Sequence, residues 1–324
     1  MQFGILGPIF VRDGEDCITP SAPKQRELLA LLLFNAGQVM LAETCIDELW
    51  DERPPDSART TLQTYVLHLR KSMSRAAGGS PRQARGRLAT CNGGYCLEVG
   101  DGELDLDVFR TRCAEGRTAL RKGADHIGAE LLGQALAVWR GPALVDVARG
   151  PLLNGYITGL EEQRINVLEQ RIEADLRLGK HHELLGELSE LVVQHPLNEN
   201  VHAQFMLALY RSGRTAHALK VFREVRAMLR QEVGIDPSVR LRNLHEAILV
   251  EDPALEISAH PASRLSLDLM TVVPQQAMSP EHTRALREKQ LERGRARLER
   301  VSGRRDYGLS VMAPRVQSAA RTGS

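Results

Sequence analysis

Two stretches of the chain match each other at an offset of 34 residues, and this repeat restricts the fold more than any other feature. Residues 173–191 (EADLRLGKHHELLGELSEL) align with residues 207–225 (LALYRSGRTAHALKVFREV), and Gly179 falls on Gly213. Apolar positions also coincide, as with Leu188 and Phe222. A supersecondary unit that recurs at a fixed period buries its apolar face by stacking on the next unit.

The period of 34 residues is that of tetratricopeptide helix pairs. His195-Pro196 and Asp236-Pro237 each mark the end of the second helix of a pair. Leu, Ala and Arg are frequent and aromatic residues make up only 4% of the chain, which favours helices. We therefore predict an all-α, tetratricopeptide-like helical repeat domain over residues 104–252.

The first 100 residues follow another pattern. Short apolar runs separated by GP and RDGED predict a small antiparallel sheet within residues 1–20. Three helices are predicted, from Pro23 to about Asn35, over residues 42–50, and from Asp56 or Ser57 to about Ser74. The runs RLAT and YCLEV predict a hairpin with Gly93 and Gly94 in its turn. This order predicts an N-terminal winged helix-turn-helix domain (α+β). Because an all-α repeat domain follows it, the predicted fold class of the whole chain is mainly α.

The third predicted helix lies in an interval without acids. No Asp or Glu occurs between Asp56 and Glu98, although the whole chain holds 42 basic and 41 acidic residues. The interval contains seven cations, which are Arg59, Arg70, Lys71, Arg75, Arg82, Arg85 and Arg87. Because solvated faces normally mix both signs, this pattern is typical of a surface that meets a polyanion such as duplex DNA.

On a helical wheel, residues 60–73 divide into two faces. The apolar stripe, predicted to pack inward, consists of Leu62, Val66, Leu69 and Met73, with Tyr65 at its border. The opposite face carries Thr60, Gln63, Thr64, Leu67, His68 and Lys71. Gln can bind adenine and Thr can bind a base edge or a thymine methyl, so this face suits the major groove. An exposed Leu67 suits a thymine methyl, although a lone surface leucine is also common.

Cations at the edges of this helix are expected to follow the phosphates. The predicted recognition helix therefore adds Arg59, Thr61, Arg70 and Arg75 to the residues of the polar face. In the hairpin, Arg87 at the base and Asn92-Gly93 at the tip are predicted to reach the adjacent minor groove or phosphates. The alternative for each of these residues is that it lies on an ordinary solvated face of the helix. The absence of Asp and Glu from the interval favours the interpretation as a DNA-binding surface.

Residues 253–324 are predicted to be a basic, largely disordered tail, with 280–301 compatible with a helix. The chain has no apolar run long enough for a membrane span and no secretory signal, so we expect no membrane partner. Five scattered cysteines fit a reducing compartment, which predicts a cytoplasmic, nucleoid-associated protein.

No group of residues predicts catalysis. His181-His182 lacks further ligands at metal-binding spacing, and a solvated pair is favoured. Cys91 and Cys96 flank the hairpin turn; a disulfide is one alternative, and two ordinary strand cysteines are favoured. There is no G-x-x-x-x-G-K-[ST] motif and no nucleophile–base pair. We expect no enzyme, no metal and no cofactor.

Long stretches of the chain resemble a known family. GPIFV…PSAPKQRELLALLLFNAGQV, DELWDERPPDSARTTLQTYVLHLRKSM and RLAT…GGYCLEV are similar to the OmpR/PhoB-type winged-helix domain. LAVWRGPALVDV and the segment from LEEQRINVLEQ to LRNLHEAIL are similar to the bacterial transcriptional activation domain. In this order, over about residues 1–255, the chain resembles the SARP family (Streptomyces antibiotic regulatory proteins), pathway-specific activators of antibiotic biosynthesis in actinobacteria.

The resemblance implies a sequence-specific activator that binds direct repeats upstream of biosynthetic promoters, self-associates on DNA and recruits the RNA polymerase holoenzyme. By position, the recognition helix is about Ser57–Met73 and the wing is Leu88–Val99. The loop Trp50–Asp56 matches the family's polymerase-contacting loop, which assigns that role to Asp51, Glu52, Arg53 and Asp56; a plain connector is the alternative. The chain shows neither the ATPase module nor the receiver domain of larger regulators. The alternative function is a helical-repeat scaffold with a winged helix that does not bind DNA.

Overall fold

The computed structural model describes residues 1–51, 53–76 and 86–256, without the side chains of Arg75 and Ala76. The predictions for Glu52, the Arg75 side chain, Arg82, Arg85 and residues 257–324 fall outside the described residues. The chain begins with the predicted antiparallel sheet. Its strands, in the order β1-β2-β3, are β1 (Gln2–Gly4), β2 (Phe10–Asp13) and β3 (Asp16–Cys17).

Three helices follow, as predicted, namely α1 (Pro23–Phe34), α2 (Ala42–Trp50) and α3 (Ala58–Ala76). Pro23 begins α1, and its fixed φ suits a helix. Proline has no backbone N–H, but an N–H in the first turn of a helix has no acceptor within the helix, so nothing is lost. α3 begins directly after Ser57, whose carbonyl accepts the N–H of Thr61 at 2.9 Å. The apolar faces of the three helices meet in one core that includes Leu28, Leu49 and Leu62.

A second three-stranded sheet, in the order β4-β6-β5, contains the wing. β5 (Leu88–Cys91) and β6 (Gly94–Leu97) form the predicted hairpin, and β4 (Met40–Leu41), which no apolar pattern predicts, pairs with the other edge of β6. The turn is Asn92-Gly93, with φ of 44° and 80°, as a type I′ turn requires. The prediction of a Gly93-Gly94 turn is therefore wrong by one residue, because Gly94 already pairs in β6.

The helical part confirms the repeat. Its helices are α5 (Asp105–Arg121), α6 (Asp125–Ala137), α7 (Pro151–Arg177), α8 (His181–Gln194), α9 (Glu199–Arg211), α10 (Thr215–Glu232) and α11 (Val239–Leu249), followed by a 3-10 turn, η1 (Pro253–Leu255). The turns of α7–α8 and α9–α10 hold Gly179 and Gly213 at φ of 82° and 72°. In each turn, the N–H of the residue after the glycine donates to the carbonyl five residues earlier: Lys180 to Asp175 at 3.0 Å, and Arg214 to Leu209 at 2.9 Å. Gly123 (φ 75°) closes α5–α6 in the same way, so a third pair exists that the alignment did not reveal.

Two hydrophobic cores stabilise the described chain, and neither ends at residue 100. The first core runs from Phe3 to Val167 and joins the winged helix to α5, α6 and the N-terminal part of α7. The second runs from Ile172 to Leu255, so packed chain extends slightly beyond residue 252. The change from sheet to repeat is thus a change of secondary structure within one continuous core.

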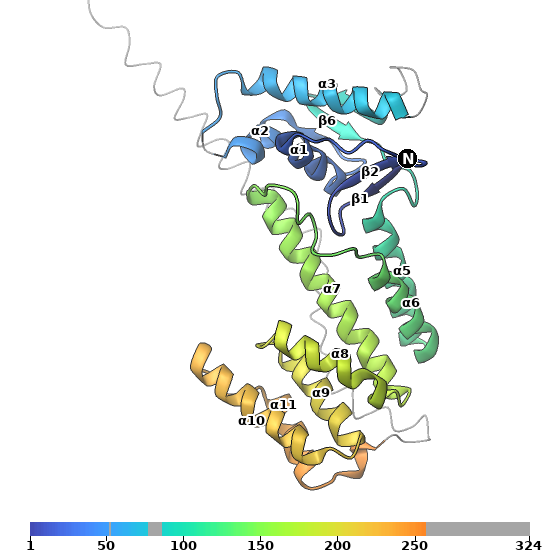
Figure 1. The fold of residues 1–324 in the computed structure, drawn as a ribbon, viewed down its shortest axis with the longest axis vertical. Helices are drawn as coiled ribbons and strands as arrows, with labels where there is room; N and C mark the ends of the chain where they lie inside the picture. The colour runs from blue at the N-terminus through green and yellow to red at the C-terminus, as the bar shows by residue number, and fades with distance from the viewer. Residues whose placement is uncertain (52, 77–85, 257–324) are drawn as a thin grey trace, which may run out of the picture. The chain divides into compact units, whose positions relative to one another are not determined.

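Buried carboxylates strengthen this junction. Asp105, at the start of α5, accepts the backbone N–H groups of residues 5 and 6 and pairs with Arg140 at 2.8 Å. Glu48 of α2 accepts the N–H groups of residues 152 and 153, in the first turn of α7, at 2.8 and 2.9 Å. Figure 1 shows the start of α7 beneath α1 and α2. Among the helices described, none combines the length and the apolar character that crossing a bilayer requires.

Candidate nucleic-acid interface

The polar face predicted for α3 is open to solvent. Its apolar stripe (Leu62, Val66, Leu69 and Met73) is at most 3% exposed. The residues predicted on the opposite face are all exposed, and they are Thr60, Gln63, Thr64, Leu67, His68 and Lys71. Thr61 differs, because it is half-buried at the border of the stripe. Figure 1 shows α3 at one edge of the winged helix with one side uncovered by other described elements.

Neighbouring elements fix how α3 presents this face. The Trp50 ring, at the end of α2, stacks on Tyr65 with centroids 6.1 Å apart and planes 13° apart. Gln25 of α1 lies 3.0 Å from Nδ1 of His68, which orients the imidazole on the exposed side. Arg59 lies 3.8 Å from Glu43, and both side chains are largely exposed, so this ion pair holds Arg59 only weakly.

Arg70 connects α3 to the wing instead of extending freely. Its Nε donates to the carbonyl of Leu88 and its guanidinium to the hydroxyl of Thr90, both at 2.8 Å. The prediction that Arg70 contacts a phosphate stays a prediction, but the side chain has a second task, which is to set the distance between α3 and β5. Lys71 is exposed and follows it on the same helix.

Arg87 has a partner at the base of the wing. Its guanidinium makes two bonds to the Glu103 carboxylate, at 2.6 and 3.2 Å, and Glu103 also accepts from the N–H of Gly100 and from the ammonium group of Met1. Burial raises the pKa of Glu103, but these donors outweigh burial and lower the pKa to about 2. The tip residues Asn92 and Gly93 are exposed, as predicted.

The Glu103 cluster predicts a pH dependence of stability. A carboxylate whose pKa falls from 4.5 unfolded to about 2 folded stabilises the protein above pH 4.5, and this contribution is lost as the pH falls toward 2. We expect the difference in urea midpoint between the wild type and Arg87→Met to be full at pH 6 and to shrink below pH 4.5. A difference that stays constant from pH 6 to pH 3 would contradict this assignment.

The loop between α2 and α3 presents charge. Asp51, Arg53 and Asp56 are exposed, and Asp51 takes a left-handed backbone conformation with φ of 54°. This conformation turns the chain sharply where α2 ends. Sequence reasoning found these residues but missed Gln25, Thr90 and Glu48, since polar residues on separate elements give no periodic signal of their contact.

The cysteines and histidines considered in the sequence analysis form neither a disulfide nor a metal site among the described residues. Cys91 and Cys96 are both free, and they face Gly94 and Ala89 across the hairpin. The rings of His181 and His182 lie 4.6 Å apart. In the described part of the chain, no group of three His, Cys, Asp or Glu side chains is arranged to hold a metal ion.

Comparison with known proteins agrees with this architecture. Residues 18–95 match the model of the transcriptional regulatory protein C-terminal domain, and residues 104–249 match the bacterial transcriptional activator domain. The two matches in this order define a class of transcriptional regulator in which an OmpR/PhoB-type winged helix precedes a helical repeat.

Similar proteins with the same two domains show which family of transcriptional regulators the chain belongs to. The regulatory protein DnrI of Streptomyces peucetius is 44% identical over 79% of this chain and 94% of its own length. The transcriptional regulator RedD of Streptomyces coelicolor is 34% identical over 79% of this chain and 73% of its own. The chain therefore belongs to the SARP family of transcriptional regulators.

A solved structure shares the fold. EmbR of Mycobacterium tuberculosis, in complex with a low-affinity phosphopeptide, has a TM-score of 0.73 and 33% sequence identity. The similarity covers 78% of this chain and 65% of the EmbR chain. The winged helix and the helical repeat thus occur together in an experimentally determined relative.

Proposed function

We propose that the protein is a sequence-specific DNA-binding activator of a secondary-metabolite gene cluster. α3 enters the major groove with its open face, and the wing follows the adjacent backbone. The observation that carries the proposal is the exposure of Thr60, Gln63, Thr64 and His68 together on a helix with a fully buried opposite side. These side chains can bind base edges, and no described acid lies on that face.

The proposed protein partner follows from the position of the loop between α2 and α3. The exposed charges of Asp51, Arg53 and Asp56 lie at one end of α3, so a protein that contacts them lies beside the bound duplex. We propose RNA polymerase holoenzyme as this partner. The helical repeat aligns neighbouring protomers on direct repeats of the operator, and the protein acts at the nucleoid in the cytoplasm.

A pair of variants tests the role of the face. Gln63→Ala should reduce discrimination between the operator and a mutated operator by ~1–3 kcal/mol, because a bidentate base contact is lost. Lys71→Ala should weaken both duplexes alike and make the salt dependence less steep by about one phosphate contact. We choose Lys71 instead of Arg70 because Arg70 also holds the wing.

Electrophoretic mobility shifts at several salt concentrations give both quantities. No shift of any duplex at low salt would favour the scaffold alternative. Unchanged selectivity in Gln63→Ala, together with wild-type binding, would show that another part of the surface reads the bases.

A further inference from the structure

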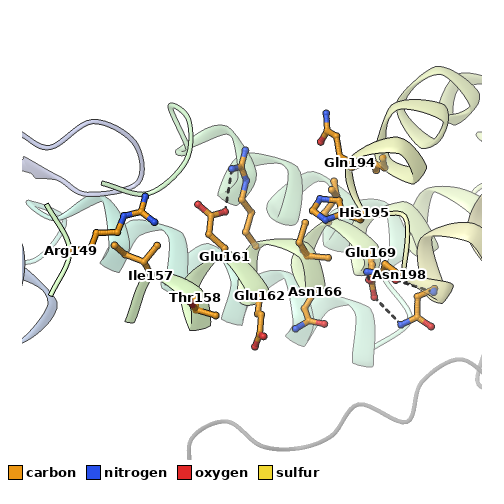
Figure 2. A pocket seen from close by; sticks show the side chains of 15 residues that line it. Arg149, Ile157, Thr158, Glu161, Glu162, Asn166, Glu169, Gln194, His195 and Asn198 are labelled. Atoms are coloured by element: carbon orange, nitrogen blue, oxygen red, sulfur yellow. Dashed lines mark hydrogen bonds and ion pairs between the residues drawn. The ribbon is translucent and has the colours of Figure 1, made fainter. Parts of the chain in front are cut away.

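In the groove between the middle of α7 and the α8–α9 connection, the charged side chains largely satisfy one another (Figure 2). Glu161 lies 3.6 Å from Arg164, and Glu169 accepts hydrogen bonds from two asparagine side chains, at 2.6 and 3.2 Å. Glu162 and Arg149, which also line the groove, have opposite charges. The groove therefore selects no ligand by its charge, and the more informative polar groups are those on the open face of α3.

Two side chains on the open face of α3 are held by hydrogen bonds within the protein. Nδ1 of His68 lies 3.0 Å from the side-chain nitrogen Nε2 of Gln25, which is half-buried on α1. The Thr64 hydroxyl donates to the carbonyl of Thr60 at 3.0 Å. Because Thr64 and His68 are four residues apart, they are neighbours on the same face of the helix. Each hydrogen bond uses one polar role of its side chain and leaves the other role for a ligand.

The contact with Gln25 determines which nitrogen of His68 carries the proton. A carboxamide nitrogen donates hydrogen bonds and does not accept them, so Nδ1 of His68 is the acceptor in this pair. A neutral imidazole has one donor nitrogen and one acceptor nitrogen. Because Nδ1 is the acceptor, the proton lies on Nε2. His68 therefore presents a single N–H donor on the open face of α3.

A single N–H donor distinguishes the bases in the major groove. Guanine exposes two acceptors there, N7 and O6, whereas cytosine exposes the N4 amino group, which is itself a donor. An N–H that is held toward cytosine would face a second donor and lose its hydrogen bond to water without replacement, which is unfavourable. Thr64 has the opposite character, because its only hydroxyl proton goes to Thr60. Its oxygen can only accept, as from the amino group of adenine or cytosine.

We propose that Gln25 is a positioning residue for base recognition. By holding His68 as an N–H donor, it makes the protein select guanine over cytosine at the base pair that His68 meets. The inference rests on the proposed function, in which α3 enters the major groove. It adds a residue of α1, outside the recognition helix, to those that determine which operator is bound.

Selection from a random duplex library measures the base preference at each position of the bound site, for the full chain and its variants. The position whose preference is lost in His68→Ala identifies the base pair that His68 meets. The wild type should prefer guanine over cytosine there by about tenfold. Gln25→Met, which has a side chain of similar length but no donor, should lose most of this preference.

The matched control is Thr64→Val, which keeps the shape of the side chain and removes only the hydroxyl. It should change the preference at its own base pair and leave guanine at the position of His68. The state of His68 is measured separately, on the free protein, by nitrogen-15 NMR of histidine-labelled samples at about pH 8.5, where an ordinary imidazole is neutral. The His68 signals are those missing from His68→Ala. The wild type should show a nearly pure Nε2–H form, and Gln25→Met a larger share of the Nδ1–H form.

The two measurements separate this inference from the proposed function. If no duplex is bound, the proposed function fails and the base assignment fails with it, whatever the state of His68. If duplexes are bound, any of four results would overturn the inference alone. These are a predominant Nδ1–H form of His68 in the wild type, no base pair that depends on His68, cytosine at that base pair, or a Gln25→Met preference equal to that of the wild type.

Discussion

Replacing Glu48 with alanine is expected to lower the free energy of unfolding by about 3 kcal/mol, because two buried backbone N–H groups lose a carboxylate acceptor. Glu48 is 3% exposed, and its two oxygens accept the N–H groups of Leu152 and Leu153 at 2.8 and 2.9 Å. Removal of the side chain leaves the first turn of α7 uncapped inside the shared core. Urea unfolding followed by circular dichroism measures the loss.

Two variants refine this expectation. Glu48→Gln retains an oxygen acceptor and should cost about half as much. Gly150→Ala should be as harmful as Glu48→Ala, since a Cβ there would lie 2.4 Å from the Glu48 carbonyl oxygen and 2.5 Å from its carboxyl carbon. The matched control is Gly159→Ala on α7, where a Cβ meets no atom of the described part of the chain within 4 Å. Equal effects of the two glycine substitutions would refute the tight junction.

The Glu48 contact also shows which part of the fold the sequence could not predict. Periodicity identifies buried positions such as Leu153 and Leu62, because one helix face repeats every three or four residues. It does not say which element covers that face. The change of pattern near residue 100 predicts a boundary between domains, but it gives no sign that the side chains on both sides of that point share a core that extends to Val167.

The candidate interface likewise has one part that the sequence predicts and another that it does not. The open face of α3 was predictable, since residue spacing alone decides which side chains lie opposite the apolar stripe. The partners of Arg70 and Arg87 were not predictable, because Leu88, Thr90 and Glu103 are 15 or more residues away and approach only through the folding of the hairpin. Charge counted along a sequence therefore overstates the cations that are free to meet DNA.

Gly94→Ala is expected to have the second large effect, on both stability and the placement of the wing. A Cβ at this position would lie 2.2 Å from the carbonyl oxygen of Met40 and 2.9 Å from Cα of Leu41, so β4 must move away from β6. Such a clash with backbone atoms cannot relax by side-chain rotation and should cost about 3 kcal/mol. If the proposed function is right, operator affinity falls further than stability alone explains, because β6 carries the wing.

Gly86→Ala provides the control, since a Cβ there meets no atom of the described residues within 4 Å and Gly86 lies two residues before the wing. Its urea midpoint and operator affinity should remain close to those of the wild type. Of the two added methyl groups, only the one at residue 94 meets β4, so a wild-type-like Gly94→Ala would mean that β4 does not pair with β6 in this way. Because β4 pairs through only Met40 and Leu41, and Leu41 lies opposite Gly94, the missing side chain at residue 94 is what lets β4 approach β6 this closely.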